Sequence, residues 1–158
     1  MGILMDFENC KDVRLATPED IPDILRLARM ACEESDLYNY DERKVIELIR
    51  LYFEGRGGII GVIGGRGENL SACLVLVMSD DWYSSDLNLH EVALFVIPEK
   101  RKSDYAKQLM SFAKKSADAL GVNLRIGVFH NEKTMAKIRL YQRQFCQKGA
   151  YFVYEPQN

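Results

Sequence analysis

The sequence predicts an α/β domain, layered as in α+β proteins, in which helices flank both faces of a mixed central sheet. Two observations support this fold class. Short apolar runs, bounded by turn residues, alternate with longer stretches in which apolar residues recur every three or four positions. The resulting order of elements is β α α β β β α β α β, and strands that are separated by a helix run parallel.

The first third of the chain combines a short strand with two helices. Residues 12–16 alternate polar and apolar side chains, as a strand does. Residues 17–20 (Thr-Pro-Glu-Asp) predict a helix start, because Thr caps, Pro fits the first turn and acidic groups favour the positive helix end. This helix runs to about Ser35. A loop over 36–40 and a second helix over 41–53 follow.

Three strands occupy the middle of the chain. Strands over 58–64 and 70–77 are joined by a turn rich in Gly and Asn. A polar loop over 79–86 carries the only tryptophan, and the central strand covers 87–97. Alternation along the central strand places His90, Val92, Leu94 and Val96 on one face, and Glu91, Ala93, Phe95 and Ile97 on the other.

The last third predicts two more helices and two more strands. An amphipathic helix begins at Tyr105 and ends near residue 120. It is followed by a strand over 122–130, a helix from 131 to about 144, and a last short strand over 151–154.

Length and composition predict one globular domain over 1–158, with a loosely ordered lead at 1–11. Of the 158 residues, 47% are hydrophobic and 28% are charged. No apolar run reaches the ~20 residues that span a bilayer and no signal peptide is recognised, so we expect a cytoplasmic protein without a membrane partner. The net charge of −2 gives no reason to expect a nucleic-acid partner.

The spacing of cysteines and histidines favours neither a disulfide framework nor a metal site. The four cysteines form no C-x-x-C pair, so free thiols in a reducing compartment are expected. His90 and His130 lie too far apart in the sequence for metal-ligand spacing, and we therefore predict no metal.

The polar turn after the central strand is the main candidate for a binding site. Pro98 cannot donate to a β-ladder, so it closes the strand. The helix that begins at Tyr105 leaves its first N–H groups without partners, and these groups, together with the helix dipole, make a natural phosphate site. Arg101, Lys102 and Lys107 add positive charge around it.

This turn resembles motif A of the GNAT N-acetyltransferases. That motif has an Arg or Gln, two free positions, a Gly, one free position, and then a Gly or Ala. The corresponding residues here are Arg101, Lys102, Ser103, Asp104, Tyr105 and Ala106. The resemblance implies that they bind the pyrophosphate of acetyl-CoA, the cosubstrate. Asp104 departs from the family, which usually has Gly, and it brings a carboxylate near the proposed pyrophosphate.

A second resemblance lies beyond motif A. Asn131 follows the next strand, and Tyr141 comes ten residues later in a Leu-Tyr pair. By resemblance, Asn131 binds the pantetheine part of coenzyme A and Tyr141 protonates the leaving thiolate as a general acid. The alternative for Tyr141 is a structural residue that covers the sheet. Phe145-Cys146 stands where the family usually has Gly-Phe.

The resemblance leaves the general base open. Many family members place a Glu or His on the central strand, eleven residues before the first position of motif A, and this position is His90. Histidine titrates near neutral pH and suits a base. Glu91 is its neighbour on the opposite face. A purely structural His90 and a water chain that acts as the base are the alternatives.

The backbone of the central strand is the last cofactor-binding candidate. In the family this strand separates from the next one, and its free N–H groups pair with the pantetheine amides. Here those groups would be near Phe95, Val96 and Ile97. One such N–H, close to the thioester oxygen, would act as an oxyanion donor.

The acceptor is expected to be an amine of a small molecule or a protein. Candidates to line its site are Tyr38, Tyr40, Trp82 and Glu91, although packing on the surface would also explain the aromatic residues. Acidic loop residues favour a cationic acceptor; they are Glu33, Glu34, Asp36, Asp80, Asp81 and Asp86.

Two functions stay open from the sequence. The first is an acetyl-CoA-dependent N-acetyltransferase that works by direct attack of the amine, since no cysteine occupies a site position. The second is a GNAT-fold protein that has lost turnover and serves as a binding or interaction module, which the departures at Asp104 and Phe145-Cys146 favour. Family members often pair strand edges, so a homodimer is compatible with both.

Overall fold

A computed structural model describes residues 9–35, 38–66, 69–128 and 134–157. The chain separates into two compact units, Met1–Gly127 and Val128–Asn158, and each is described by itself. Among the described residues, the larger unit contains the sheet and three of the four α-helices. The single domain over 1–158 stays a prediction.

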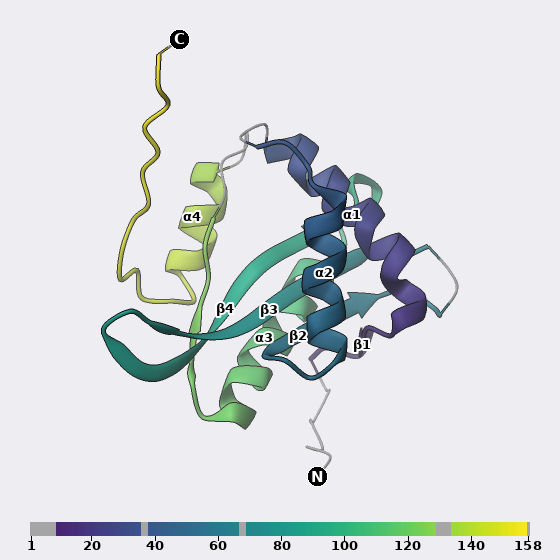
Figure 1. Cartoon of the computed structure of the whole chain (residues 1–158), viewed down its shortest axis with the longest axis horizontal. Coiled ribbons are helices and arrows are strands. Elements are labelled where there is room, and N and C mark those ends of the chain that lie inside the picture. Colours follow the sequence, from purple (N-terminus) through teal and green to yellow (C-terminus); the bar gives the residue numbers. More distant parts are fainter. Residues whose placement is uncertain (1–8, 36–37, 67–68, 129–133, 158) are drawn as a thin grey trace. The chain divides into compact units, whose positions relative to one another are not determined.

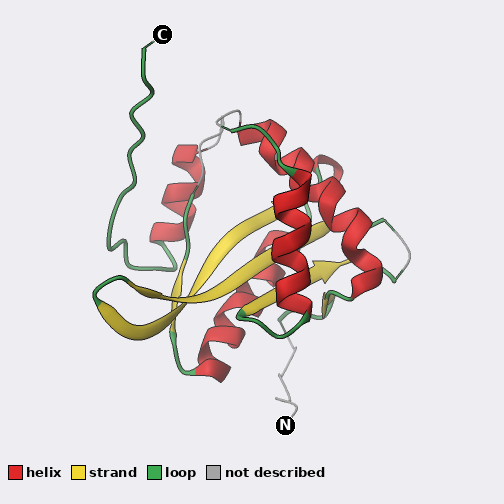
Figure 2. Cartoon of the chain, in the orientation of Figure 1, coloured by secondary structure: helices red, strands yellow, loops and turns green. Residues whose placement is uncertain are grey.

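The sheet of the larger unit has five strands in the order β1-β2-β3-β4-β5 (Figure 2). Neighbours from β1 to β4 pair antiparallel, whereas β4 and β5 pair parallel. The mixed sheet predicted from the sequence is therefore confirmed. The strands are β1 (Val13–Leu15), β2 (Gly58–Ile63), β3 (Ala72–Asp81), β4 (Ser84–Val96) and β5 (Asn123–Arg125).

Helices cover both faces of this sheet, as predicted. The helices α1 (Ile21–Ser35) and α2 (Glu42–Phe53) lie on one face, and α3 (Tyr105–Leu120) lies on the other (Figure 1). The helices approach the sheet so closely that there is no room for a side chain at two glycines of β2. A Cβ at Gly58 would come within 2.0 Å of the Tyr52 ring of α2, and a Cβ at Gly61 within 2.9 Å of the Phe112 ring of α3.

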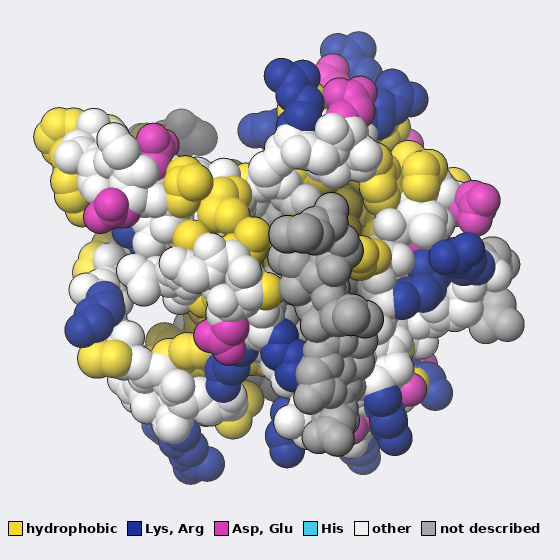
Figure 3. Space-filling view, turned by 90° about the horizontal axis from the view of Figure 1, so that it is seen from below, with side chains coloured by type: hydrophobic (Ala, Val, Ile, Leu, Met, Phe, Trp, Pro, Cys, Tyr) yellow, Lys and Arg dark blue, Asp and Glu magenta, His cyan; other side chains and the backbone are white. Residues whose placement is uncertain are grey.

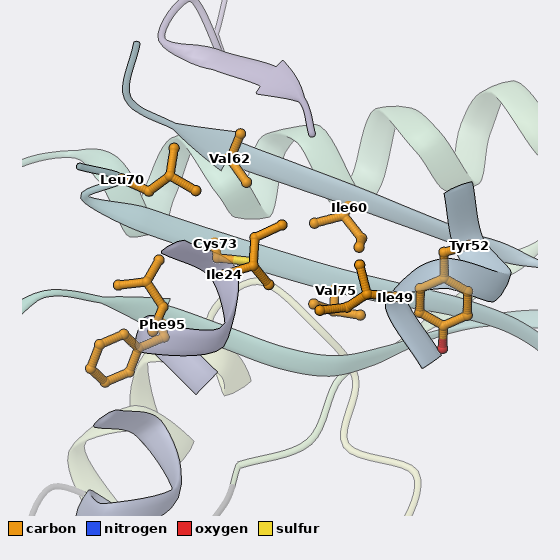
Figure 4. Packing of buried hydrophobic residues seen from close by; sticks show 10 residues of the cluster. Ile24, Ile49, Tyr52, Ile60, Val62, Leu70, Cys73, Val75 and Phe95 are labelled. Carbon is orange, nitrogen blue, oxygen red and sulfur yellow. The ribbon is translucent and has the colours of Figure 1, made fainter. Parts of the chain in front are cut away.

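The core between the sheet and the α1/α2 layer is apolar and tightly closed (Figure 4). Ile24 of α1 and Ile49 of α2 each have an exposed fraction of 2% and meet Cys73, Val75 and Phe95 of the sheet. Burial raises the pKa of the Cys73 thiol to about 12, so this cysteine behaves as a small apolar side chain.

A buried ion pair fixes the entry to α1. The Thr-Pro-Glu-Asp start is confirmed, although its first turn (η1, Pro18–Asp20) is a 3-10 helix. Asp20 is only 3% exposed. Its carboxylate accepts two hydrogen bonds of 2.8 Å from the Arg14 guanidinium of β1 and one of 2.8 Å from the Thr17 amide. Hydrogen bonding to Arg14 holds the pKa of the Asp20 carboxyl below its usual value.

Two side chains of α1 also anchor the beginning of β3. Arg26 Nη2 donates to the Leu70 carbonyl at 2.8 Å, and the Asp23 carboxylate accepts from the Leu70 amide. Both backbone groups of a fully buried residue are thereby satisfied by one helix.

The β3–β4 connection differs from the prediction. The expected polar loop over 79–86 is wrong, because β3 continues to Asp81 and β4 begins at Ser84. Only Trp82 and Tyr83 form the turn, and the long hairpin extends past α1 and α2 (Figure 1). The end of this hairpin is exposed to solvent, so its strands have no face to bury and carry polar residues, which the sequence alone makes look like a loop.

The smaller unit contains α4 (Thr134–Gln142), which has no buried residue. The strand predicted over 151–154 is wrong: these residues are described without regular secondary structure and are exposed. A strand needs a neighbour for its ladder, and the described part of this unit contains no other strand.

The described surface carries mixed charges. On the face seen in Figure 3, Lys and Arg side chains form several separate groups. Within the described ranges, no three His, Cys, Asp or Glu side chains are grouped as metal ligands would be. None of the described helices is long and apolar enough to cross a bilayer.

The buried ion pair gives a stability prediction. Asp20→Asn should lower the free energy of unfolding at pH 7 by about 2 kcal/mol, because the variant removes a charged partner of Arg14. The folded-state pKa of Asp20 is lowered, so its contribution is complete above the unfolded value of about 3.9 and is lost as pH falls through the folded value. Urea unfolding should thus show a difference in the free energy of unfolding between wild type and Asp20→Asn that disappears below about pH 4.

The exposed neighbour Glu19 supplies the control, and Glu19→Gln should change stability little. A gap between wild type and Asp20→Asn that stays constant from neutral to acid pH would contradict the prediction.

Candidate functional site

A β-bulge interrupts the central strand β4. Val75 of β3 pairs with Ala93, whereas the next residue, Leu76, pairs with Glu91. Val92 is therefore an extra residue without a partner on β3. A bulge bends its strand and locally disrupts pairing, so it changes the direction of the strand at this point.

The bulge moves His90 and Glu91 to faces that strict alternation does not predict. Residues that pair directly in an antiparallel ladder have side chains on the same face. His90 pairs with Val77, which packs on the core cluster below α1 and α2, so His90 shares the face of Phe95. Glu91 pairs with Leu76 on the α3 face. The predicted separation of His90 from Phe95 by face is therefore wrong.

His90 is half-buried, and one of its ring nitrogens is left without a hydrogen-bond partner in the described structure. Its Nε2 is shielded from solvent and has no hydrogen-bond partner among the described residues. A shielded, unsatisfied nitrogen is costly unless a ligand or water completes its hydrogen bonding.

One edge of β4 is open beyond the bulge. The pairing with β5 covers only Asn88–His90 on β4, so in the described part of the sheet Glu91–Val96 have no strand on that side. The Ile97 amide donates to the Ser71 carbonyl at 3.0 Å, toward β3. Because backbone groups of successive strand residues point to opposite sides, the Val96 amide points to the open side.

This geometry corrects the expected set of free amides. Ile97 is already bonded, and Phe95, two residues away in the strand, points toward β3 as well. Of the three amides near the strand end, Val96 alone is directed to the open edge. The separation of the two strands agrees with the expectation from the sequence.

The turn after β4 leads into α3 with several amides unused. It contains a 3-10 turn (η2, Pro98–Lys100), and the Tyr105 amide donates to Ser103 Oγ at 3.3 Å. Five further amides in and after the turn have no acceptor within the described residues; they belong to Glu99, Lys102, Asp104, Ala106 and Lys107. Free amides at the positive end of a helix can bind an anion.

Arg101 lies across the strand end and is held by three neighbours. Its Nε donates to the Val96 carbonyl at 3.1 Å, and Nη2 pairs with Glu34 of α1 at 2.5 Å. Its guanidinium carbon also lies 5.4 Å from the centre of the Phe95 ring. Glu34 therefore offsets part of the positive charge that the sequence assigned to the turn.

Asp104, which replaces the usual Gly, precedes α3 without capping it. Its carboxylate makes no hydrogen bond to an amide of the first helical turn. Instead, Oδ1 accepts a hydrogen bond of 3.0 Å from Gln108 Nε2. The side chain thus turns along the helix toward Gln108.

The candidate acceptor residues are separated in space. Tyr40 packs against α1, where its hydroxyl donates to the Leu25 carbonyl at 3.2 Å and burial raises its pKa. Tyr38 is 64% exposed. Trp82 is 95% exposed at the hairpin tip, and the seven strand residues Ser84–His90, at ~3.3 Å each, place it about 20 Å from His90. Trp82 is therefore not beside the open edge of β4.

The remaining predicted residues belong to the smaller unit. Tyr141 lies in the last turn of α4, and its ring meets Phe145 edge to face with centroids 6.1 Å apart. The amides of Gln144 and Phe145 both donate to the Tyr141 carbonyl. Asn131 lies outside the described residues.

Sequence reasoning missed the partners of two turn residues, namely Glu34 for Arg101 and Gln108 for Asp104. Glu34 lies in the last turn of α1, where a negative charge is unfavourable and therefore signals a cationic partner. Gln108 follows Asp104 by four residues, the spacing at which side chains of a helix meet. Both signals were present in the sequence.

Comparison with known proteins identifies the fold. No family model and no curated protein matches the sequence. An aminoglycoside antibiotic 6'-N-acetyltransferase from Acinetobacter haemolyticus is 13% identical with a TM-score of 0.67, covering 92% of this chain and 97% of that one. An acetyltransferase of Trypanosoma brucei is 12% identical with a TM-score of 0.68, covering 92% of this chain and 98% of that one. AAC(6')-Iy, in complex with the bisubstrate analogue CoA-S-monomethyl-acetylneamine, is 11% identical with a TM-score of 0.68. The match covers 93% of this chain and 97% of that one.

The contacts of Arg101 predict unequal costs for two substitutions. Arg101→Met should lower the free energy of unfolding by about 1–2 kcal/mol, because the Val96 carbonyl loses its donor. Glu34→Gln removes only an exposed ion pair and should cost less than about 1 kcal/mol. Urea unfolding of the two variants tests this order, and equal costs would show that the bond to Val96 contributes nothing.

Proposed function

We propose that this chain, which has the fold of the GNAT acetyltransferases, is an acetyl-CoA-dependent N-acetyltransferase that acts by direct attack of an amine. The observation that supports it best is the junction of β4 and α3. There the open Val96 amide and the unused amides of Lys102, Ala106 and Lys107 lie along one stretch of backbone. A ligand with an amide-containing arm and a diphosphate would use both groups.

Acetyl-CoA fits this junction chemically. It supplies an activated acetyl group as a thioester. The amides at the start of α3 would hold its pyrophosphate, and the Val96 N–H at the open edge of β4 would pair with the pantetheine arm or the thioester oxygen. The resemblance adds Asn131 as a pantetheine ligand.

The transfer requires one base and one acid. His90 accepts the proton that the acceptor ammonium must lose before its nitrogen attacks the carbonyl carbon; a water chain is the alternative. The C–N bond forms as the C–S bond breaks, and Tyr141 donates its proton to the departing sulfur. The second proton that the attacking nitrogen loses as it becomes an amide then restores the Tyr141 hydroxyl. The unused Nε2 of His90 supports the first assignment, and the Leu-Tyr resemblance supports the second.

We propose an amine of a small molecule or a protein as the acceptor. Two of the neighbours by fold are named as aminoglycoside 6'-N-acetyltransferases. Acidic side chains near the site would favour a cationic amine, but Glu34 of α1 already pairs with Arg101, and Asp81 of β3 with Arg125. Glu91 on β4 and Tyr38 remain candidate acceptor contacts. The free cysteines of the described chain fit a cytoplasmic location.

A non-catalytic binding module is the second candidate. The observation that favours it is the pairing of Arg101 with Glu34, which reduces the positive charge at the turn. Such a protein would bind acetyl-CoA weakly or not at all. Cofactor binding therefore separates the two functions.

Arg101→Glu should weaken acetyl-CoA binding by about tenfold or more, because it reverses a charge beside the proposed pyrophosphate site. Isothermal titration measures the dissociation constant. Arg43→Glu, the same change at an exposed position on α2, is the control and should bind like the wild type. Equal binding by Arg101→Glu would place the cofactor elsewhere, and absence of binding by the wild type at millimolar cofactor would favour the module.

Tyr141→Phe should lower kcat by about 100-fold while acetyl-CoA affinity stays within about twofold, because only the proton donor is removed. Thiol release with a panel of amines (an aminoglycoside, a polyamine and a lysine peptide) measures the rate. Tyr154→Phe changes an exposed tyrosine of the same unit and is the matched control. An unchanged kcat in Tyr141→Phe would remove Tyr141 from the mechanism.

A further inference from the structure

The residue before α3 behaves unlike most aspartates at helix starts. An aspartate in this position usually accepts hydrogen bonds from the second or third amide of the helix, which here belong to Ala106 and Lys107. Asp104 does not do so. If it did, its own carboxylate would occupy the amides that the proposed function assigns to a pyrophosphate.

Gln108 holds the Asp104 carboxylate in its observed place. Gln108 is 3% exposed although it lies on α3 only four residues from Asp104. Its Nε2 donates to Asp104 Oδ1 at 3.0 Å and to Asp12 Oδ2 at 2.8 Å. One buried amide nitrogen thus engages two carboxylates that would otherwise repel each other.

The orientation of the Gln108 amide is fixed from the other side. Its Oε1 accepts a hydrogen bond of 2.9 Å from the Asp12 backbone amide. A backbone amide can only donate, so the oxygen must face Asp12 and the nitrogen must face the carboxylates. The hydrogen bond from the Asp12 amide therefore fixes the Gln108 amide so that its NH2 group faces Asp104.

We propose that Gln108 is a positioning residue that keeps the start of α3 open for the pyrophosphate of acetyl-CoA by holding the Asp104 carboxylate away from the helix amides. This inference rests on the proposed function. It explains how a chain with Asp in place of Gly can retain an anion site at this turn. Without Gln108, the Asp104 carboxylate caps α3 and competes with the phosphates.

The test is a double-mutant cycle on acetyl-CoA affinity, measured by titration on the full chain. Gln108→Met removes the donor and keeps the length of the side chain. It should weaken binding about tenfold, since the freed carboxylate then occupies the amides. In the Asp104→Ala background the same substitution should change binding less than about twofold, because no carboxylate remains to be held. If Gln108→Met weakened acetyl-CoA binding only by disturbing the fold, the loss of affinity would be equal in both backgrounds.

A second measurement does not depend on the folding of Gln108→Met. Amide hydrogen exchange of Ala106 and Lys107, resolved by NMR in ligand-free protein, should be equally fast in wild type and in Asp104→Ala. Exchange in the wild type that is about tenfold slower would show that the carboxylate already caps the helix, and would overturn the inference.

The outcomes separate this inference from the proposed function. Binding by the wild type with an equal loss for Gln108→Met in both backgrounds overturns the inference alone. Binding by Asp104→Ala but not by the wild type also overturns the inference, while it supports the function. Absence of binding by both proteins overturns the function, and the inference with it.

Discussion

The unequal pairing of β4 is the constraint on which the rest of this structure depends. On one side β4 is paired with β3 along nearly its whole length, which anchors it in the core. On the other side β5 reaches only as far as His90. The bulge at Val92 lies just beyond that point, where it bends the strand. As a result, a central strand, normally saturated on both sides, exposes backbone donors next to a helix start.

Side chains, rather than further backbone pairing, hold the end of this strand in place. Arg101 satisfies the Val96 carbonyl while the Val96 amide stays unused, so one residue is bonded at its acceptor and open at its donor. Glu34 orients the guanidinium from α1. The turn is therefore supported by the α1 layer on one side and, through Gln108 and Asp12, by the beginning of β1 on the other.

The fold was predictable because its signals are local and repeated. The cap at residues 17–20, the amphipathic α2 and α3 helices and the apolar runs of β2 and β3 each have a clear period. The bulge in β4 was not predictable from the sequence, because the side-chain types of β4 are also compatible with strict alternation. Only the pairing with β3 reveals the extra residue. Trp82 was misplaced for a similar reason: a two-residue hairpin and a polar loop have the same composition. The exposed 151–154 segment has high strand propensity, but propensity does not supply a neighbouring strand.

The replacement of Gly by Asp104 does not by itself close the turn. Asp104 has φ −87° and ψ 12°, a conformation open to any L-residue, so the backbone here does not require the freedom of glycine. A Cβ is thus tolerated, and what matters is the destination of the carboxylate. In this chain a buried glutamine takes that carboxylate, and its own orientation is dictated by a backbone amide. The loss of a motif glycine is therefore weak grounds for assuming lost binding when the same helix carries a partner for the new side chain.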